Sequence, residues 1–276
     1  MKKLTSVLLC ILLSLSLFAC VAAEEEPDNI NDYAAAANTH KLSEDEGGGT
    51  LTFEDGHAES AVIVGYTGKS VPHKVIIPSV ITDAKRDVSG IGDEAFYQLS
   101  TIKEIVLPDT VTFIGKFAFA GCTALESIVI PESVEYIDEN AFYGCTSLKS
   151  VTFKGKSVTS IGDFAFLGCT ALETIVLPEG LLEIGNYTFG NCSALKNVKT
   201  PSTLESIGTL TFHGCEALNA EGGLTLSASI KEIGEFAFNG ISKENIVAPE
   251  GSYAAEYVNK MTDSETGAEI ETDIGE

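Results

Sequence analysis

Five cysteines recur through the middle of the chain at nearly constant spacing. Of the side chains in this sequence, their thiols could take part in the widest range of chemistry. The cysteines are Cys122, Cys145, Cys169, Cys192 and Cys215. In a secreted chain such cysteines can form disulfides or bind zinc. The zinc interpretation is weak, because the sequence has no CxxC pair. Its four histidines also lie at unrelated positions, namely His40, His57, His73 and His213.

Two other residues occupy the same position as these cysteines. The first unit of the pattern holds Leu99 there, and the last holds Ile241. The position therefore accepts an apolar group of moderate size, and a free cysteine behaves as a small hydrophobe. We expect a ladder of buried structural thiols. The alternative is a disulfide between stacked neighbours, because adjacent strands lie about 4.8 Å apart.

Sequence motifs of catalysis are lacking. There is no GxSxG elbow, HExxH pair, P-loop or dinucleotide-binding fingerprint. Carboxylates are abundant, but they fall at positions where a solvated surface explains them, such as Glu126, Glu132, Glu135, Glu173 and Glu179. The sequence predicts that the protein is not an enzyme and uses no cofactor or metal.

The elements that position these side chains are tandem repeats. An isoleucine opens each unit, at Ile91, Ile114, Ile137, Ile161, Ile184, Ile207 and Ile233. The intervals are 23, 23, 24, 23, 23 and 26 residues. Repeats of about 20 to 29 residues are typical of leucine-rich-repeat solenoids, in which each coil buries its apolar face against its neighbours.

Each unit contains a short predicted strand. In the unit from Leu125, Ile128 and Ile130 share one face by period-two alternation, and Pro131 ends the strand because it has no amide hydrogen to donate. After the opening isoleucine comes a small residue, usually glycine, suited to a positive φ or to a close backbone approach. A phenylalanine follows in every unit, and the seven rings should stack: Phe96, Phe119, Phe142, Phe166, Phe189, Phe212 and Phe238.

The consensus sequence of the repeat is IG-x-x-AF-x-GC-x-x-L-x-x-I-x-I-P. It resembles that of the BspA-type bacterial leucine-rich-repeat family, also called the Treponema pallidum type. The resemblance runs from about Tyr66 to about Lys260. It implies an α/β repeat solenoid, a right-handed array of about seven 23-residue coils with a parallel sheet on the concave face and short helical or irregular segments opposite. It also implies a surface-displayed protein used for adhesion or protein contact.

Residues 1–19 have the layout of an export signal, with Lys2 and Lys3 before an apolar run too short for a membrane span. Two cleavage sites compete. Cys20 follows a lipoprotein-like box and would become a lipidated N-terminus, whereas Val21-Ala22-Ala23 would suit ordinary signal peptidase. We predict an exported protein at the cell surface, lipid-anchored through Cys20 or otherwise secreted.

The remaining segments are assigned by composition. We predict an acidic flexible tether over 20–49, an N-terminal cap and entry coil over 50–90, and the solenoid over 91–248. A C-terminal cap over 249–262 and an acidic tail over 263–276 complete the chain. Extra residues should disturb the array near Lys154 to Ser157 and near Glu221 to Gly223.

The charge restricts the partners. The formal net charge is −23, and −25 without the two lysines of the signal. This excludes binding to a nucleic-acid backbone or to anionic lipid by charge, so a membrane is reached only through a lipid anchor. We expect a monomer with a protein or glycan ligand, such as a host surface or matrix component.

The predicted binding site is the outward side of the strands. Alternation leaves one row of small and β-branched side chains facing solvent: Glu104, Val106, Ser127, Val129, Ser150, Thr152, Thr174, Val176, Asn197 and Lys199. Solenoids use such concave surfaces to bind partners, although these residue types also simply suit strands. The alternative function is a passive structural or spacer element of the cell envelope.

Overall fold

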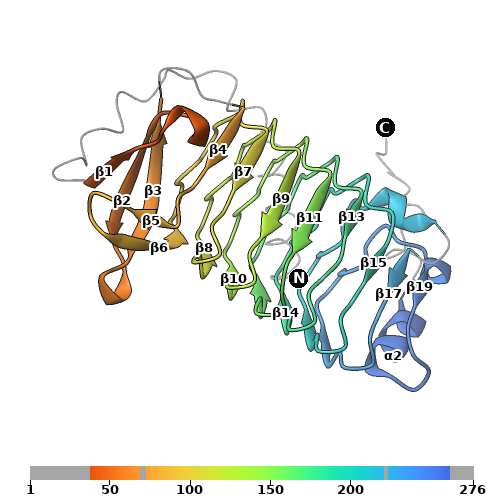
Figure 1. Ribbon diagram of the computed structural model, residues 1–276. Coiled ribbons are helices and arrows are strands. Elements are labelled where there is room, and N and C mark those ends of the chain that lie inside the picture. The colour runs from red at the N-terminus through yellow and green to blue at the C-terminus, as the bar shows by residue number, and fades with distance from the viewer. Residues whose placement is uncertain (1–37, 69–72, 221–222, 262–276) are drawn as a thin grey trace, which may run out of the picture. The chain divides into compact units, whose positions relative to one another are not determined.

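A computed structural model describes residues 38–68, 73–220 and 223–261. These residues form a stack of coils that follow one another in chain order, from β4 to β19 in Figure 1. Each coil contributes one strand to each of two parallel ladders. The predicted solenoid of 23-residue repeats is therefore confirmed.

The predicted strands form the first ladder. Five of them make one parallel sheet: β4 (Lys74–Ile76), β7 (Glu104–Val106), β9 (Ser127–Ile130), β11 (Ser150–Phe153) and β13 (Thr174–Ile175). Three more make a second sheet: β15 (Val198–Lys199), β17 (Leu224–Thr225) and β19 (Ile246–Val247). A single bridge between Thr174 and Asn197 joins the two sheets, so the ladder narrows there but continues.

A second ladder, absent from the sequence prediction, ends at the opening isoleucines. It comprises β6 (Arg86–Ile91), β8 (Phe113–Ile114), β10 (Tyr136–Ile137), β12 (Ser160–Ile161), β14 (Glu183–Ile184), β16 (Ser206–Ile207) and β18 (Glu232–Ile233). Most of these strands have two residues, and a pair of residues shows no alternation that a pattern search can detect. The isoleucines point inward and are buried.

The third side of each coil carries turns and not helices within the repeats that the structure describes. In one coil Phe117, Phe119 and Gly121 donate their backbone N–H groups to the next coil, to carbonyls of Glu139, Ala141 and Tyr143, at 2.8–3.1 Å. The same pattern recurs from coil to coil. We call these the turn-side amide bonds. They replace the helical part of the prediction with irregular backbone whose polar groups are paired between coils.

Left-handed backbone recurs at two positions of every turn, but not where the sequence predicted it. Phe117 has φ of 54° and Gly121 has φ of 74°. The glycine after the opening isoleucine serves the other predicted purpose, close approach: a Cβ on Gly208 would lie 2.5 Å from the carbonyl carbon of Gly185 in the preceding coil. Stacking distance, not backbone strain, requires glycine there.

The first cap starts earlier than predicted and includes part of the predicted tether. β1 (Asn38–Lys41) pairs antiparallel with β2 (Thr50–Asp55), which pairs with β3 (Ala61–Thr67), and β3 continues into the second ladder. Leu42 is buried, and its N–H donates to the Gly49 carbonyl at 3.0 Å. The prediction of a flexible tether is wrong over residues 38–49. It depended on the acidic composition of this segment, which did not indicate that one leucine is buried or that the glycines form a tight turn. Short elements complete this cap: η2 (Glu44–Glu46), η3 (His57–Glu59) and β5 (Val80–Ile81).

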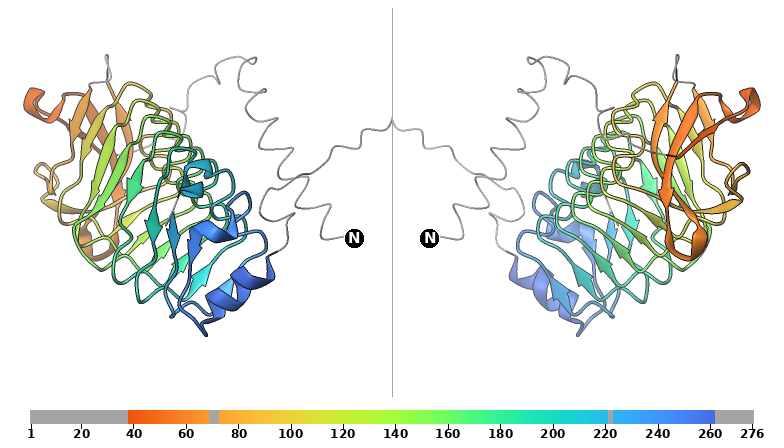
Figure 2. Two further views of the ribbon diagram at one scale, coloured as in Figure 1. Left: turned by 90° about the vertical axis from the view of Figure 1, so that its right-hand side faces the viewer. Right: turned by 90° about the vertical axis from the view of Figure 1, so that its left-hand side faces the viewer.

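A helix lies at the other end, within the segment predicted to be the C-terminal cap. α2 (Tyr253–Lys260) begins at Ser252, whose hydroxyl accepts a hydrogen bond from the Ala255 N–H at 3.1 Å. It follows η4 (Glu216–Asn219) and η5 (Lys243–Asn245). Figure 2 shows α2 at the end of the stack, where Tyr257 contacts the last phenylalanine ring edge-on. Among the described residues, no helix is long and apolar enough to cross a membrane.

The two predicted irregularities have different outcomes. Near Lys154 the strand β11 ends in a bend, and the Lys154 N–H donates to the Ile130 carbonyl at 3.0 Å. The second falls partly on residues 221–222, which lie outside the described residues. The first ladder resumes at Gly223, whose carbonyl accepts a hydrogen bond from the Val198 N–H at 2.8 Å. Predictions for residues 1–37, which include the export signal and Cys20, and for 263–276 also lie outside the described residues.

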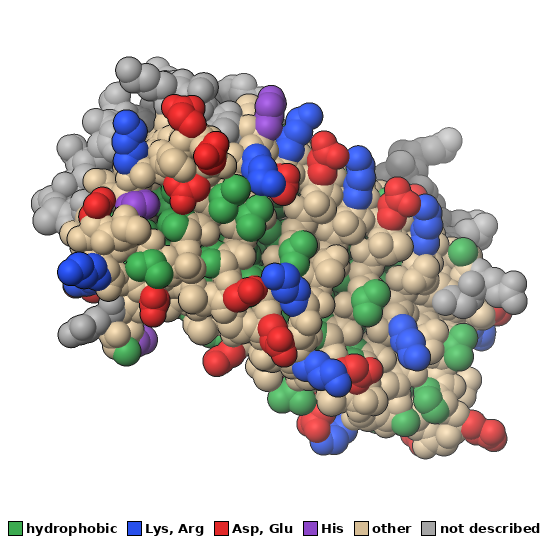
Figure 3. Space-filling model, viewed as in Figure 1, with side chains coloured by type: hydrophobic (Ala, Val, Ile, Leu, Met, Phe, Trp, Pro, Cys, Tyr) green, Lys and Arg blue, Asp and Glu red, His purple; other side chains and the backbone are tan. Residues whose placement is uncertain are grey.

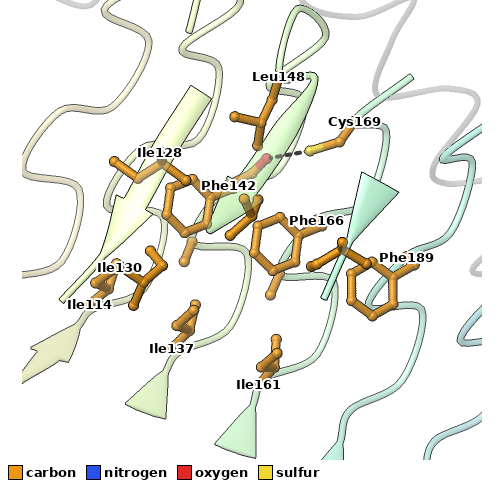
Figure 4. Packing of buried hydrophobic residues seen from close by; sticks show 14 of the residues in the cluster. Ile114, Ile128, Ile130, Ile137, Phe142, Leu148, Ile161, Phe166, Cys169 and Phe189 are labelled. Atoms are coloured by element: carbon orange, nitrogen blue, oxygen red, sulfur yellow. Dashed lines mark hydrogen bonds between the residues drawn. The ribbon is translucent and has the colours of Figure 1, made fainter. Parts of the chain in front are cut away.

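The core is a continuous column of phenylalanine rings. All seven are buried, and successive ring centroids lie 5.1–6.2 Å apart with stacked planes. Figure 4 shows Phe142, Phe166 and Phe189 in one row, between the isoleucines of the two ladders. Tyr66 of the first cap stacks on Phe96, and Tyr257 of α2 contacts Phe238. Aromatic side chains from both caps therefore close the column.

Candidate functional site

The predicted outward residues lie on the first ladder and face solvent. We call the ten residues from Glu104 to Lys199 named above the outer strip. Nine are exposed and Ser150 is half-buried, whereas the alternating residues such as Ile105 and Ile128 are buried. Val176 is 81% exposed and Val129 is 44% exposed. The alternation that placed these residues outward was therefore read correctly, while their role in binding stays a prediction.

The structure extends this strip at both ends with residues that the sequence reasoning omitted. Lys74 of β4 is exposed and pairs with Glu104 at one end. Val247 of β19 is 51% exposed and lies opposite Thr225, which pairs with Lys199. The signal in the sequence was the same alternation, in the last unit. Exposed β-branched side chains thus recur along both sheets of the first ladder, from Val106 to Val247.

Ion pairs between coils border the outer strip. Lysine and glutamate alternate at one repeat position, and Glu126 lies between Lys103 at 4.0 Å and Lys149 at 3.4 Å. Lys196 pairs with Glu173 at 2.6 Å. Figure 3 shows blue and red side chains alternating along one edge of this face, with separate green patches on the tan surface beside it. The edge is charged but largely neutralised, so it contributes little net field to the strip.

The five repeated cysteines form the expected buried ladder of free thiols. They also do something that the hydrophobic interpretation missed. Each thiol donates to the phenylalanine carbonyl of the preceding coil, for example Cys169 Sγ to Phe142 O at 3.3 Å, the dashed line in Figure 4. The other four bonds measure 3.0–3.3 Å. Cysteine thus supplies a weak donor as well as apolar volume, and the bonds tie adjacent coils together.

Burial controls the chemistry of these thiols. It raises the pKa of Cys122, Cys169 and Cys215 to about 12. It also raises the pKa of Cys145 and Cys192, to which neighbouring thiols add. A thiolate is the reactive form, so these groups are inert near neutral pH. Within the described residues, no group of three or more His, Cys, Asp and Glu side chains could hold a metal ion.

The surface is hollowed along the second ladder, where no site was predicted. A trough of about 480 Å³ runs from β10 to β18. The outward residues of its five strands are Tyr136, Ser160, Glu183, Ser206 and Glu232. The sequence carried only a faint signal for it, because these residues precede the opening isoleucine in strands too short to recognise.

Comparison with known proteins agrees with this geometry. The profile of the BspA type leucine rich repeat region matches residues 89–219 in six copies. A leucine-rich-repeat protein of T. pallidum shares 26% identity, over 80% of this chain and 97% of that one, with a TM-score of 0.65. Fold and repeat together define a leucine-rich-repeat solenoid. The chain belongs to the BspA-type leucine-rich-repeat family.

Two further solved structures are similar, with lower TM-scores. A leucine-rich cell surface protein from Faecalibacterium prausnitzii shares 22% identity, over 78% of each chain, with a TM-score of 0.48. A leucine-rich-repeat protein from Bacteroides capillosus shares 30% identity, over 45% of this chain and 91% of that one, with a TM-score of 0.40. Comparison with curated protein sequences gives no match.

Proposed function

We propose that this protein is an interaction module that binds a protein or glycan through the outer strip. The observation that carries the proposal is the row of solvent-exposed β-branched side chains, in which Val176 and Val247 leave more than half of their surface open to water. Apolar groups on a regular sheet gain free energy when a partner covers them. Leucine-rich-repeat solenoids generally bind proteins, which supports a scaffold that binds and does not catalyse.

The borders of the strip also suit a partner. Its backbone is held by parallel pairing on both sides, as at Ser127, which pairs with Glu104 and with Ser150. Little of this protein therefore needs to become ordered when a partner binds. The ion pairs along one edge provide a polar rim around the apolar row. An interface of about 800 Å² per partner, the usual size for a specific complex, requires several coils to act together.

Lysines inserted into the strip test this proposal. Ser127→Lys, Thr152→Lys and Thr174→Lys together place three cations on a surface that a partner must desolvate, and we expect at least a tenfold loss of affinity. Folding should change little, because exposed substitutions usually alter stability by about 0.5 kcal/mol or less. Binding to immobilised matrix proteins and glycans, measured by surface plasmon resonance, gives the affinities.

A matched variant controls for charge. Thr123→Lys, Thr170→Lys and Ser193→Lys add the same three charges at exposed turn positions away from the strip, and they should leave affinity within about twofold. Equal binding by the strip variant and the parent would show that the partner contacts another face. If the parent binds nothing in a broad screen, the spacer function becomes the better explanation.

We also propose that the protein is exported and displayed at the cell surface through a lipid on Cys20. The support is the sequence alone, namely the charged and apolar leader that ends before this cysteine. A Cys20→Ser variant should move from the membrane fraction to the medium or periplasm. Mass spectrometry of the mature N-terminus decides the matter: a diacylglyceryl cysteine is expected, and an unmodified terminus after Ala23 would contradict anchoring.

A further inference from the structure

The trough on the second ladder has a regular shape that the outer strip lacks. Large and small side chains alternate along it, in the order Tyr136, Ser160, Glu183, Ser206 and Glu232, and each is paired in register with the next. The two serines are half-buried, whereas the three larger residues are exposed. Each serine therefore forms a notch between two projecting side chains.

The charge in the trough has one sign. Its charged lining residues, Asp138, Asp163, Glu183 and Glu232, are all acidic. Asp163 is held in place, because its carboxylate accepts from the Asn186 N–H at 2.7 Å and from the Asn186 side-chain amide at 3.0 Å. The trough thus contains carboxylates that form no ion pair among the described residues, together with hydroxyl oxygens, and all of these oxygens accept hydrogen bonds.

The neighbouring lysines form their ion pairs with other carboxylates, although Lys116 is also attracted more weakly by Asp138. Lys116 pairs with Glu139 at 3.2 Å and Lys231 pairs with Glu205 at 2.7 Å, both outside the trough lining. An aromatic platform stands at one end, where the Tyr136 ring stacks on Phe113 at 5.6 Å and is 39% exposed. Such a ring beside carboxylates favours a cation.

The spacing of the notches selects the conformation of an occupant. Ser160 and Ser206 are two coils apart, which is about 9.6 Å at the usual strand spacing of about 4.8 Å. In a polyproline II helix every third side chain lies on the same face, with a repeat of about 9.3 Å. In a β-strand, same-face side chains repeat at about 6.6 Å, which does not match.

We propose that the trough binds a partner's peptide segment in the polyproline II conformation, with a lysine or arginine at every third residue. One cation enters the notch at Ser160, between the Tyr136 ring and Glu183. The next enters the notch at Ser206, between Glu183 and Glu232. Such a segment arrives with little conformational entropy to lose and with charge complementary to the trough. This surface is independent of the outer strip.

A synthetic peptide provides the probe. Fluorescently labelled (Lys-Pro-Pro)₄ should bind the parent protein at least tenfold more tightly, by anisotropy at physiological salt, than a peptide of identical composition with its four lysines consecutive. Glu183→Gln with Glu232→Gln should weaken binding at least tenfold. The control pair Glu132→Gln with Glu250→Gln removes the same charge at exposed positions outside the trough lining, and it should weaken binding less than threefold.

Shape is tested separately from charge. Ser206→Leu fills one notch without changing charge and should also weaken binding at least tenfold, whereas the lysine variant of the outer strip should bind the peptide like the parent. Urea unfolding confirms that each variant remains folded. Equal affinities for the two peptides, equal losses from the two glutamine pairs, or full binding by Ser206→Leu would each overturn the proposal. So would a neutral glycan that binds in the trough when the peptide does not.

Discussion

Phe142→Ala is expected to lower the free energy of unfolding by about 3–5 kcal/mol, the range for removing a buried phenylalanine. The ring is fully buried and stacks on Phe119 at 5.2 Å and on Phe166 at 5.1 Å. Neither neighbouring coil can move into the cavity, because backbone hydrogen bonds fix their separation. Urea unfolding followed by circular dichroism measures the loss.

The end of the column supplies the comparison. Of the described phenylalanines, only Phe212 stacks on Phe238, at 6.2 Å, and the other side of Phe238 meets the edge of Tyr257 on the capping helix. A short helix can adjust more easily than a hydrogen-bonded coil, so Phe238→Ala should cost less. Equal losses at the two positions would argue that the rings contribute separately and not as a column.

Alkaline pH is expected to unfold this protein through its cysteines. Burial raises the pKa of three of the thiols to about 12 and raises that of the other two, whereas a thiol in the unfolded chain has a pKa of about 8.5. Protonated thiols therefore stabilise the fold fully below pH ~8.5, and this contribution falls as pH rises toward 12. Five such groups can remove up to about 7 kcal/mol per pH unit.

Removing two thiols separates the contribution of the thiols to the pH dependence of stability from the contribution of other titrating groups. In a Cys145→Ala, Cys192→Ala variant, three of the five buried repeat thiols remain. The slope of unfolding free energy that these buried thiols cause between pH 8.5 and 10 should therefore fall by two fifths. The measurement is a series of urea titrations across this pH range. An unchanged slope would show that the buried thiols do not set the alkaline limit.

The apolar columns of the repeat could be predicted from the sequence because each depends on one residue type at one position. Burial requires an apolar residue such as Ile128, ring stacking requires Phe142, and the end of the strand suits Pro131. The thiol bond from Cys169 to the Phe142 carbonyl could not be predicted, because its acceptor belongs to another coil. A position that also accepts Leu99 gives no hint of a donor.

The first cap and the trough depended on information spread along the chain. Leu42 is a single apolar residue in an acidic stretch, and its burial depends on β1 pairing with β2, which no local pattern specifies. The trough depends on how Tyr136, Ser160 and Glu183 alternate between coils. That alternation is visible only after the second ladder is known to exist and its register is known.

The turn-side amide bonds run in one direction, opposite to other bonds between the same coils. From Glu94 to Phe212 the turn-side amides donate toward the following coil. Elsewhere on the coils amides donate toward the preceding coil, as from Gly115 to the Ile91 carbonyl and from Glu126 to the Lys103 carbonyl. A coil at either end of a bare stack would therefore leave both N–H and C=O groups without a partner coil. Each end of such a stack could accept hydrogen bonds and also donate them, so neither end is protected from further pairing by its backbone groups alone.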